Sequence, residues 1–201
     1  MFTGIVQDVG RVVSREARGG DVRLAIAFDR LDPAGMKVGD SLCVQGCCLT
    51  AVELHERSFV ADVSRETLSL TTLGELTAGA RVNLEPSLKA GDPLGGHLVS
   101  GHVDGIGELV AIGREARSTR IEIAVPSALS RYIARKGSVT IDGVSLTINE
   151  VQGATFGINL IPHTQAVTTL GALRVGARVN VEVDQLARYV ERLLLADRSG
   201  D

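Results

Sequence analysis

The chain of 201 residues contains the same unit twice, and the two copies are separated by a constant offset of 97 residues. FTGIVQDVG at residues 2–10 aligns with VSGHVDGIG at residues 99–107. GARVNLE at residues 79–85 aligns with GARVNVE at residues 176–182, and six of these seven residues are identical. A unit of this length can bury its own core, unlike the repeats of about 20–50 residues that stack into solenoids. The repeat therefore predicts a duplicated domain.

The residues within each copy follow the pattern of short β-strands. RLAIAF, SLCV, CLTAVEL, SFVADV and RVNLE in the first copy are rich in Val, Leu and Ile and are bounded by Gly, Asp and Pro. The second copy repeats the pattern as IGELVAI, RIEIAV, SVTIDG, SLTINEV, TFGINL and RVNVEV. Six or so closely spaced strands in each copy, without long helices between them, predict a closed antiparallel barrel.

Two segments carry the sequence signals of helices. PSALSRYIARKG at residues 126–137 follows a proline and ends at a glycine, which predicts a helix inside the second copy. DQLARYVERLLLADR at residues 184–198 begins with Asp184 as a candidate N-cap and predicts a C-terminal helix. SLKAGDPLGG at residues 87–96 is expected to link the copies. The apolar stripe of the C-terminal helix would either pack on its own barrel or form a seam between subunits; it consists of Leu186, Val190, Leu193 and Leu194.

The composition excludes several classes of protein. The hydrophobic fraction of 44% and the charged fraction of 22% are ordinary for a globular protein, and the net charge of -3 gives no reason to expect nucleic acid. No apolar run approaches the roughly 18–20 residues that span a membrane, and MFTGIVQDVG lacks the basic start and apolar core of a signal peptide. We therefore expect a cytoplasmic chain that binds neither nucleic acid nor membrane, with its cysteines as free thiols.

A loop with adjacent cysteines returns in the second copy with a hydroxyl in place of one thiol. VQGCCLTA at residues 44–51 becomes IDGVSLTI at residues 141–148, so that Ser145 stands where the first copy has Cys48. A buried cysteine is usually an inert small hydrophobic residue. A heteroatom at the same place in both copies instead favours a polar ligand at the edge of each loop, because the preceding glycine lets the backbone approach closely.

The histidines and Lys136 give weaker signals. His97 and His102 lie in GGHLVSGH, where His97 is expected to order the turn between the copies and His102 takes the place of Ile5. His55 lies among charged residues and is expected on the surface. Lys136 is by default a surface cation at the end of the predicted interior helix. A metal site is not expected, because the two histidines have no third ligand and the cysteines lack zinc-site spacing. The sequence also lacks the motifs of a nucleoside triphosphate site or a dinucleotide site.

These motifs resemble those of the α-chain type of riboflavin synthase. The resemblance lies in MFTGIV at the N-terminus, GCCLT at 46–50, ETL at 66–68, GGHLVSGHVDG at 95–105, KGSVTIDGVSLT at 136–147, and LIP with TTLG between 160 and 171. It runs from residue 1 to about residue 195 and implies an all-β fold: two tandem six-stranded antiparallel Greek-key barrels related by internal duplication, plus a C-terminal α-helix. The implied domains are residues 1–97 and 98–184, two lumazine-binding barrels, and 185–201, a trimerisation helix and tail.

The resemblance also implies an activity. In this family two molecules of 6,7-dimethyl-8-ribityllumazine dismutate: one gives a four-carbon unit to the other, and the products are riboflavin and 5-amino-6-ribitylaminouracil. Each barrel binds one lumazine, and the N-terminal barrel of one subunit faces the C-terminal barrel of its neighbour in a homotrimer. No metal or redox cofactor takes part. Lumazine synthase is a further partner that the resemblance brings into consideration.

Carried over position by position, the resemblance implies two groups of substrate-binding residues. The first group is Gly4, Ile5, Val6, Cys48, Leu49, Thr50, Asp62, Val63, Ser64, Arg65, Glu66 and Thr67. The second group is Gly101, His102, Val103, Ser145, Leu146, Thr147, Ile161, Pro162, His163, Thr164, Gln165 and Ala166, with Lys136 reaching a ligand across the subunit interface. The residues implied to lie nearest the chemistry, and expected to be catalytic, are Phe2, Cys48, His102, Asp142, Ser145 and Thr147.

The chain departs from the family's usual residues at a few positions of these loops. Gln45 stands where Asn is common, Ser64 where Met is common, and residues 163–165 differ from a more usual acidic pattern. These departures concern fine specificity. The rival expectations are a lumazine-binding protein without catalysis, a flavin domain of a larger reductase, and a purely structural trimer. The presence of Cys48 and His102 together with the hydroxyls of the second copy favours the enzyme.

Overall fold

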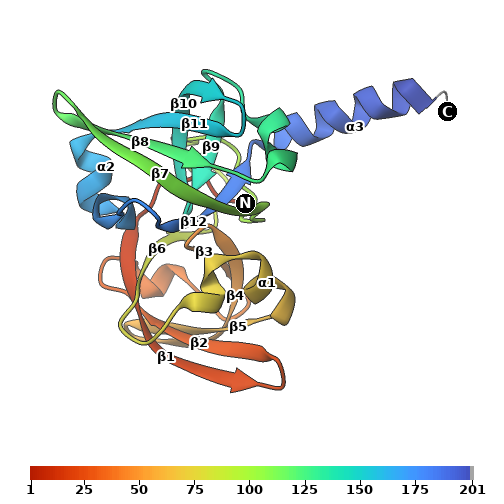
Figure 1. Ribbon diagram of the computed structural model, residues 1–201. Coiled ribbons are helices and arrows are strands. Elements are labelled where there is room, and N and C mark those ends of the chain that lie inside the picture. The colour runs from red at the N-terminus through yellow and green to blue at the C-terminus, as the bar shows by residue number, and fades with distance from the viewer. Residues whose placement is uncertain (200–201) are drawn as a thin grey trace.

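The computed structural model describes residues 1–199 and contains two closed β-barrels that follow one another along the chain (Figure 1). The first barrel has the strand order β1-β2-β5-β4-β3-β6, and every neighbouring pair is antiparallel. Its strands are β1 (Asp8–Arg18), β2 (Asp21–Ala27), β3 (Ser41–Val44), β4 (Cys47–His55), β5 (Ser58–Val63) and β6 (Arg81–Pro86).

The second barrel repeats this order with each strand number raised by six. Its strands are β7 (Gly105–Glu115), β8 (Ser118–Ala124), β9 (Ser138–Ile141), β10 (Val144–Gln152), β11 (Thr155–Leu160) and β12 (Arg178–Val183). The predicted all-β fold of two tandem six-stranded antiparallel barrels is confirmed.

The side-chain pattern explains why these strands close into barrels. In β2, DVRLAIA, every second residue is buried, so that one face of the strand lines the barrel core. The register of β1 against β2 shifts between Val12 and Ser14, and the register of β7 against β8 shifts at the equivalent place, between Leu109 and Ala111. Such bulges bend a strand and increase its twist, which a small barrel needs in order to close.

Two asparagines at equivalent positions join the barrels. The side-chain N–H of Asn83 donates to the backbone carbonyl of Asp142 at 2.9 Å, and that of Asn180 donates to the carbonyl of Gln45 at 2.8 Å. Their side-chain oxygens accept from backbone N–H groups of the opposite barrel at 2.8 and 2.7 Å. Both asparagines are buried, so these bonds fix how the barrels sit against each other.

The segment that enters each barrel packs partly on the other barrel. The two segments pair where Phe2 N–H donates to the carbonyl of Val99 at 2.8 Å and Val99 N–H donates back at 3.1 Å. Beyond this bridge, Val6 packs against the core of the second barrel, and Val103 packs against the core of the first. The two entry segments, residues 2–6 and 99–103, are therefore crossed.

Two buried carboxylates hold the crossed segments. Glu85 accepts from the N–H and hydroxyl of Thr3, both at 2.7 Å, and from the N–H of Gly4 at 3.0 Å. Glu182, at the equivalent place, accepts in the same way from Ser100 and Gly101 at 2.7 to 2.9 Å. Each carboxylate satisfies polar groups that would otherwise be buried without a partner.

Short helices follow the fifth strand of each barrel. They are α1 (Arg65–Leu70) and α2 (Pro162–Val167). Neither helix is predicted from the sequence, because six residues are too few for a helical period. The local signals are Ser64, whose hydroxyl accepts from the N–H of Thr67 at 3.2 Å, and Pro162 in the first turn. Single 3₁₀ turns complete the connections: η1 (Pro33–Gly35), η2 (Thr72–Glu75), η3 (Ser127–Tyr132) and η4 (Thr169–Ala172).

The prediction of a helix over residues 126–137 is wrong beyond the short turn η3. Ile133 is extended and buried in the core of the second barrel. Past it, Lys136 N–H donates to the carbonyl of Ile148 at 2.7 Å, and Ile148 N–H donates to the carbonyl of Gly137 at 3.0 Å. The segment ends as a turn beside β10, in which Gly137 N–H donates to the carbonyl of Ala134 at 2.9 Å, because burial of the isoleucine and these backbone bonds outweigh the helix signals.

The C-terminal helix α3 (Gln185–Ser199) projects away from both barrels (Figure 1), which confirms the predicted helix. Asp184 caps it, since its carboxylate accepts from the N–H of Leu186 at 3.0 Å. It contacts the second barrel through Glu191, which binds Arg131 and Tyr132. Arg188 adds an ion pair with Asp104 and a hydrogen bond to the carbonyl of His102 at 3.4 Å. The apolar stripe does not pack on its own barrel: Leu186, Tyr189, Val190, Leu193 and Leu194 are 54 to 67% exposed. Within residues 1–199 no helix is long and apolar enough to cross a membrane.

Candidate functional site

The first cluster of candidate residues forms around Cys48 on β4. The backbone N–H of Cys48 donates to the carbonyl of Gly101 at 2.8 Å, so that the entry segment of the second copy lies directly on this strand. Gly101 has φ +78°, and a Cβ there would lie 2.7 Å from the Cβ of Cys48. Only glycine fits this conformation and this close approach. The first cluster therefore brings His102 and Val103 to the strand that carries the thiol.

The second cluster repeats this arrangement around Ser145 on β10. Its backbone N–H donates to the carbonyl of Gly4 at 2.8 Å, and Gly4 has φ +75°. A Cβ on Gly4 would lie 2.6 Å from the Cβ of Ser145. The entry segment with Ile5 and Val6 therefore belongs to the strand that carries the hydroxyl.

The two expected groups of binding residues each combined an entry segment and a strand from the same copy. In the structure each entry segment lies beside the strand of the other copy. Residues 4–6 lie beside Ser145 instead of Cys48, and residues 101–103 lie beside Cys48 instead of Ser145. The offset of 97 shows which residues are equivalent, but it does not show on which barrel an entry segment packs.

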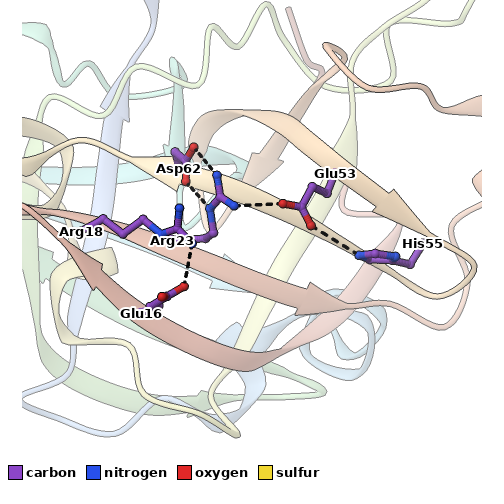
Figure 2. Close-up of polar contacts among 6 residues, drawn as sticks. All are labelled: Glu16, Arg18, Arg23, Glu53, His55 and Asp62. Atoms are coloured by element: carbon purple, nitrogen blue, oxygen red, sulfur yellow. Dashed lines mark hydrogen bonds and ion pairs between the residues drawn. The ribbon is translucent and has the colours of Figure 1, made fainter.

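The end of β5 and the start of α1 contribute the exposed part of the first group, including Asp62 on the strand and the first turn of the helix. The Asp62 carboxylate accepts from Arg23 Nε–H at 2.8 Å and from Nη2–H at 3.1 Å, while Arg23 Nη1–H donates to Glu53 at 2.9 Å. Figure 2 shows these side chains converging from three neighbouring strands, with His55 at the end of the network. Hydrogen bonds from Arg23 lower the pKa of Asp62 below its usual value. His55 is 59% exposed, as predicted for a surface residue.

The loop from β11 into α2 forms the equivalent part of the second group. Gln165 is held by two hydrogen bonds: its side-chain N–H donates to the carbonyl of Leu160 at 2.8 Å, and its oxygen accepts from the Thr119 hydroxyl at 3.1 Å. It lines an open groove of about 600 Å³ together with Pro162 and Ala166. Ile161 and His163 are exposed, and Thr164 is half-buried.

The cysteines differ in their access to solvent. Cys43 and Cys47 are buried, and burial raises the pKa of Cys43 well above its usual value and that of Cys47 to about 12. Neither can act as a thiolate near neutral pH. Cys48 is half-buried and stacks its apolar side on a small cluster with Phe2 and Val99. Of the three free thiols, Cys48 alone is available to a ligand.

The remaining candidate catalytic residues lie in different surroundings. His102 and Thr147 are exposed beside the strands of the two clusters, and Phe2 is fully buried beneath Cys48. Asp142 is only 2% exposed and lies between the barrels, where its carboxylate accepts from the N–H of Asn180 at 2.8 Å. Burial raises the pKa of Asp142 to about 7. Its contacts are those of a residue that joins the barrels.

Lys136 is exposed, with the left-handed φ of +68°. Its side chain lines a groove of about 290 Å³ with Arg120, Arg135 and Asn159. The prediction of a surface cation is confirmed, but η3 ends at Tyr132, so Lys136 does not stand at the end of a helix. Its reach across a subunit interface stays a prediction.

Three features of the clusters were not identified from the sequence as site features. They are the carboxylates Glu85 and Glu182, which the repeated GARVN motif does mark, and the contact of His97 with Ser145. His97 Nδ1 lies 2.7 Å from the Ser145 oxygen, and Nε2 lies 3.2 Å from the Thr140 hydroxyl. His97 was predicted to order the turn between the copies; the structure places it on the second cluster. Within residues 1–199 no three His, Cys, Asp or Glu side chains are arranged to hold a metal ion.

The model of the lumazine binding domain matches this chain twice, over residues 3–87 and 100–184. The chain belongs to the lumazine-binding family. Its two matched ranges contain all twelve strands of the two barrels. The departures at Gln45 and Ser64 therefore lie within an otherwise complete pair of lumazine-binding domains.

Relatives of this lumazine-binding chain include enzymes and a binding protein. It is 46% identical to the riboflavin synthase of Photobacterium phosphoreum, over 100% of this chain and 92% of that protein. It is 47% identical to the riboflavin synthase of Mycobacterium bovis, over 96% and 98% of the two chains. The fold matches the crystal structure of LumP complexed with 6,7-dimethyl-8-(1'-D-ribityl) lumazine with a TM-score of 0.81, at 29% identity and over 91% of this chain and 99% of that chain.

Proposed function

We propose that the chain is a riboflavin synthase, an enzyme that converts two molecules of 6,7-dimethyl-8-ribityllumazine into riboflavin and 5-amino-6-ribitylaminouracil. One observation carries the proposal: two equivalent clusters offer a thiol, Cys48, and a hydroxyl, Ser145, at the same backbone position. A reaction between two identical molecules needs two similar sites that differ chemically, because one molecule gives the four-carbon unit and the other accepts it. The names of the curated relatives support the same activity.

The proposed reaction requires one proton transfer and one nucleophilic addition. One lumazine loses a proton from its C7 methyl group, which is acidic because the carbanion delocalises into the ring. The other lumazine accepts a nucleophile, either water or a side chain, and the carbanion then attacks it to form an adduct. Elimination from the adduct expels the nucleophile, and the abstracted proton is returned, so that the four-carbon unit is transferred and both products are released without any net addition. His102, exposed beside Cys48, is the side chain available for proton transfer at the first cluster.

Positioning is expected to contribute more than any single side chain. Holding two rings face to face turns a bimolecular collision into a nearly intramolecular step, which can supply on the order of 7–11 kcal/mol. General acid–base catalysis by one residue contributes roughly 10²- to 10⁴-fold, or about half as much free energy. Within one subunit, the bonds from the Asn83 and Asn180 side chains fix the direction in which each barrel presents its ligand to a neighbouring subunit.

The proposal includes a homotrimer in the cytoplasm, with the two lumazines held between neighbouring subunits and lumazine synthase as an associated enzyme. The exposed apolar stripe of α3 supports assembly, because a second copy of the helix would cover it. Leu193→Glu should convert the assembly into monomers in sedimentation experiments. Val175→Glu is the matched control, since Val175 is 63% exposed but lies away from the helix. Unchanged assembly of the Leu193 variant would contradict this role of the helix.

The deciding experiment mixes the purified protein with 6,7-dimethyl-8-ribityllumazine, without added metal or cofactor, and follows absorbance and chromatography. One mole of riboflavin for every two moles of lumazine consumed is the expected result. Tight binding without turnover would contradict the enzyme and support a lumazine-binding protein instead.

A further inference from the structure

His97 connects two hydroxyl groups of the second barrel. Its Nδ1 lies 2.7 Å from the Ser145 oxygen and its Nε2 lies 3.2 Å from the Thr140 oxygen. In the first barrel the matching positions are Cys48 and Cys43. Within residues 1–199 no histidine ring is hydrogen-bonded to either of these thiols, whereas His97 binds both hydroxyls. The imidazole is therefore a feature of the second cluster alone.

The ring of His97 is neutral near pH 7. Burial lowers its pKa below the usual value and outweighs the carboxylates of Glu182 and Asp184, which act in the opposite direction. A neutral imidazole has one N–H donor and one bare nitrogen that accepts. Two arrangements are open to the ring. Either it accepts a hydrogen bond from the Ser145 hydroxyl and donates one to Thr140, or it donates to Ser145 and accepts from Thr140.

Thr140 distinguishes these arrangements. It is 1% exposed, and throughout residues 1–199 its hydroxyl has no hydrogen-bond partner other than His97. If His97 donated to Thr140, the hydroxyl proton of this buried threonine would have no acceptor, which is costly. If Thr140 donates to Nε2, its proton is satisfied. Nδ1 then carries the ring proton and donates it to the Ser145 oxygen.

We propose that His97 is a positioning residue that makes Ser145 a hydrogen-bond donor toward the ligand of the second cluster. With Nδ1–H bound to its oxygen, Ser145 must direct its own proton away from His97. The ligand atom opposite Ser145 is then an acceptor, such as a carbonyl oxygen or an unprotonated ring nitrogen of a heteroaromatic compound. This inference rests on the proposed function, in which such a ring binds at each cluster. The thiols at the first cluster are weak donors, and in the part of the chain that the structure describes neither is hydrogen-bonded to a histidine.

The ring proton can be located without any ligand. Proton–nitrogen correlation spectra of the ¹⁵N-labelled full chain separate the two neutral tautomers of a histidine, and His97→Gln assigns the signal. We expect the Nδ1–H form in the native chain and in Thr140→Ser, which keeps the hydroxyl. Thr140→Val removes the hydroxyl and should yield a mixture of tautomers. The Nε2–H form in the native chain would overturn the proposal.

Two substitutions of His97 test its effect on the ligand. The amide of Asn in His97→Asn can take the place of Nδ1 and donate to Ser145, whereas the longer Gln in His97→Gln reaches the place of Nε2 instead. We expect lumazine to bind roughly three- to tenfold more weakly to the Gln variant than to the Asn variant, the loss of one hydrogen bond. A merely structural role would be served as well by either amide, so equal affinities would overturn the proposal.

The same titration separates this inference from the proposed function. Native protein that binds lumazine without producing riboflavin contradicts the enzyme alone, and the affinities of the two variants still decide the role of His97. Native protein that binds no lumazine contradicts both.

Discussion

The two barrels have the same backbone plan but different side chains at the same places. Strand order, the bulges in the first and seventh strands and the glutamates that hold the entry segments all recur at an offset of 97. The differences lie at the clusters, where a thiol, an isoleucine and a second thiol of the first copy become Ser145, His102 and Thr140. The duplicated units therefore share what closes each barrel and differ in the side chains of the two clusters.

The crossed entry segments add a second lesson. Each cluster takes its strand from one copy and its entry segment from the other, so neither copy holds a complete cluster by itself. A change at one cluster can therefore be traced to either barrel, and pairs of equivalent substitutions can separate the two contributions.

The largest effect is expected from a side chain added where an entry segment meets a strand. In Gly101→Ala, the new Cβ would lie 2.7 Å from the Cβ of Cys48 and 3.0 Å from Phe2, at φ +78°. Backbone strain and overpacking together should lower the free energy of unfolding by about 2–6 kcal/mol. Urea unfolding measures this loss, and riboflavin formation should fall by about a hundredfold or more as the segment moves.

Gly4→Ala and Gly113→Ala complete this test. Gly4 has the same close contact with Ser145, so its variant should lose as much stability. Gly113 has no neighbour within 4 Å of a Cβ and no positive φ, so its variant should behave as the native chain. A stable, active Gly101 variant would show that the crossed segment is not packed against Cys48.

The next effect concerns Asp142 and Gln45, which occupy equivalent turns between the barrels. Burial raises the pKa of Asp142 from 3.8 to about 7, so that the folded chain keeps this carboxyl protonated where the unfolded chain does not. The contribution of Asp142 to stability therefore falls as pH rises from about 4 to about 7 and is constant above that range. Asp142→Asn should be more stable than the native chain by up to about 4 kcal/mol at about pH 8, and equal to it at about pH 4.

Urea unfolding at several pH values between these limits measures the difference. Gln45→Glu sharpens the comparison, because it places a second carboxyl at the equivalent turn and should lose stability as pH rises. A difference between Asp142→Asn and the native chain that does not change with pH would contradict the raised pKa.

A smaller effect is expected from exchanging the heteroatoms of the two clusters. Cys48→Ser should slow riboflavin formation about ten- to a hundredfold, or about 1.4–2.7 kcal/mol, without abolishing it, since positioning outweighs one side chain. Ser145→Cys reports the same exchange at the other cluster. Circular dichroism establishes that both variants are folded. Complete loss of activity in a folded Cys48 variant would show that the thiol itself is indispensable.

Much of the fold follows from the sequence because its causes are local or periodic. The offset of 97 and the alternating strands predict two barrels, and Asp184 with the apolar stripe predicts α3. The crossing of the entry segments does not follow from the sequence. It depends on hydrogen bonds to Glu85 and Glu182 and on the pairing of Phe2 with Val99, which lie far apart in the chain. The failed helix at residues 126–137 has the same origin: burial of one side chain and pairing with β10 are tertiary effects.

The sequence predicted which residues form the candidate site better than it predicted how they are arranged. Motif resemblance selected Cys48, Ser145 and the entry segments, which the structure does bring together in two clusters. It selected Asp142 as a catalytic residue, whereas the contacts place this side chain between the barrels. The role of His97 was out of reach, since its meeting with Thr140 links residues 43 positions apart with no periodic signal.

The smallest expected effect concerns the ion pairs on the outer face of the first barrel. Arg23 binds both Asp62 and Glu53, whereas in the second barrel Asn159 stands in place of Asp62 and Arg120 pairs with glutamates instead. Arg23→Gln should slightly lower the melting temperature at neutral pH and low salt, because exposed ion pairs contribute little.

Arg23 lowers the pKa of Asp62, so the contribution of this ion pair to stability is present at neutral pH and is lost as pH falls through the folded pKa. The difference from the native chain should therefore vanish in acid. It should also vanish in about 1 M salt, where the Debye length is about 3 Å and exposed ion pairs are largely screened. A large, salt-independent loss would mean that Arg23 supports the first cluster by packing, and Asp62→Asn, which copies the second barrel, would then leave stability unchanged.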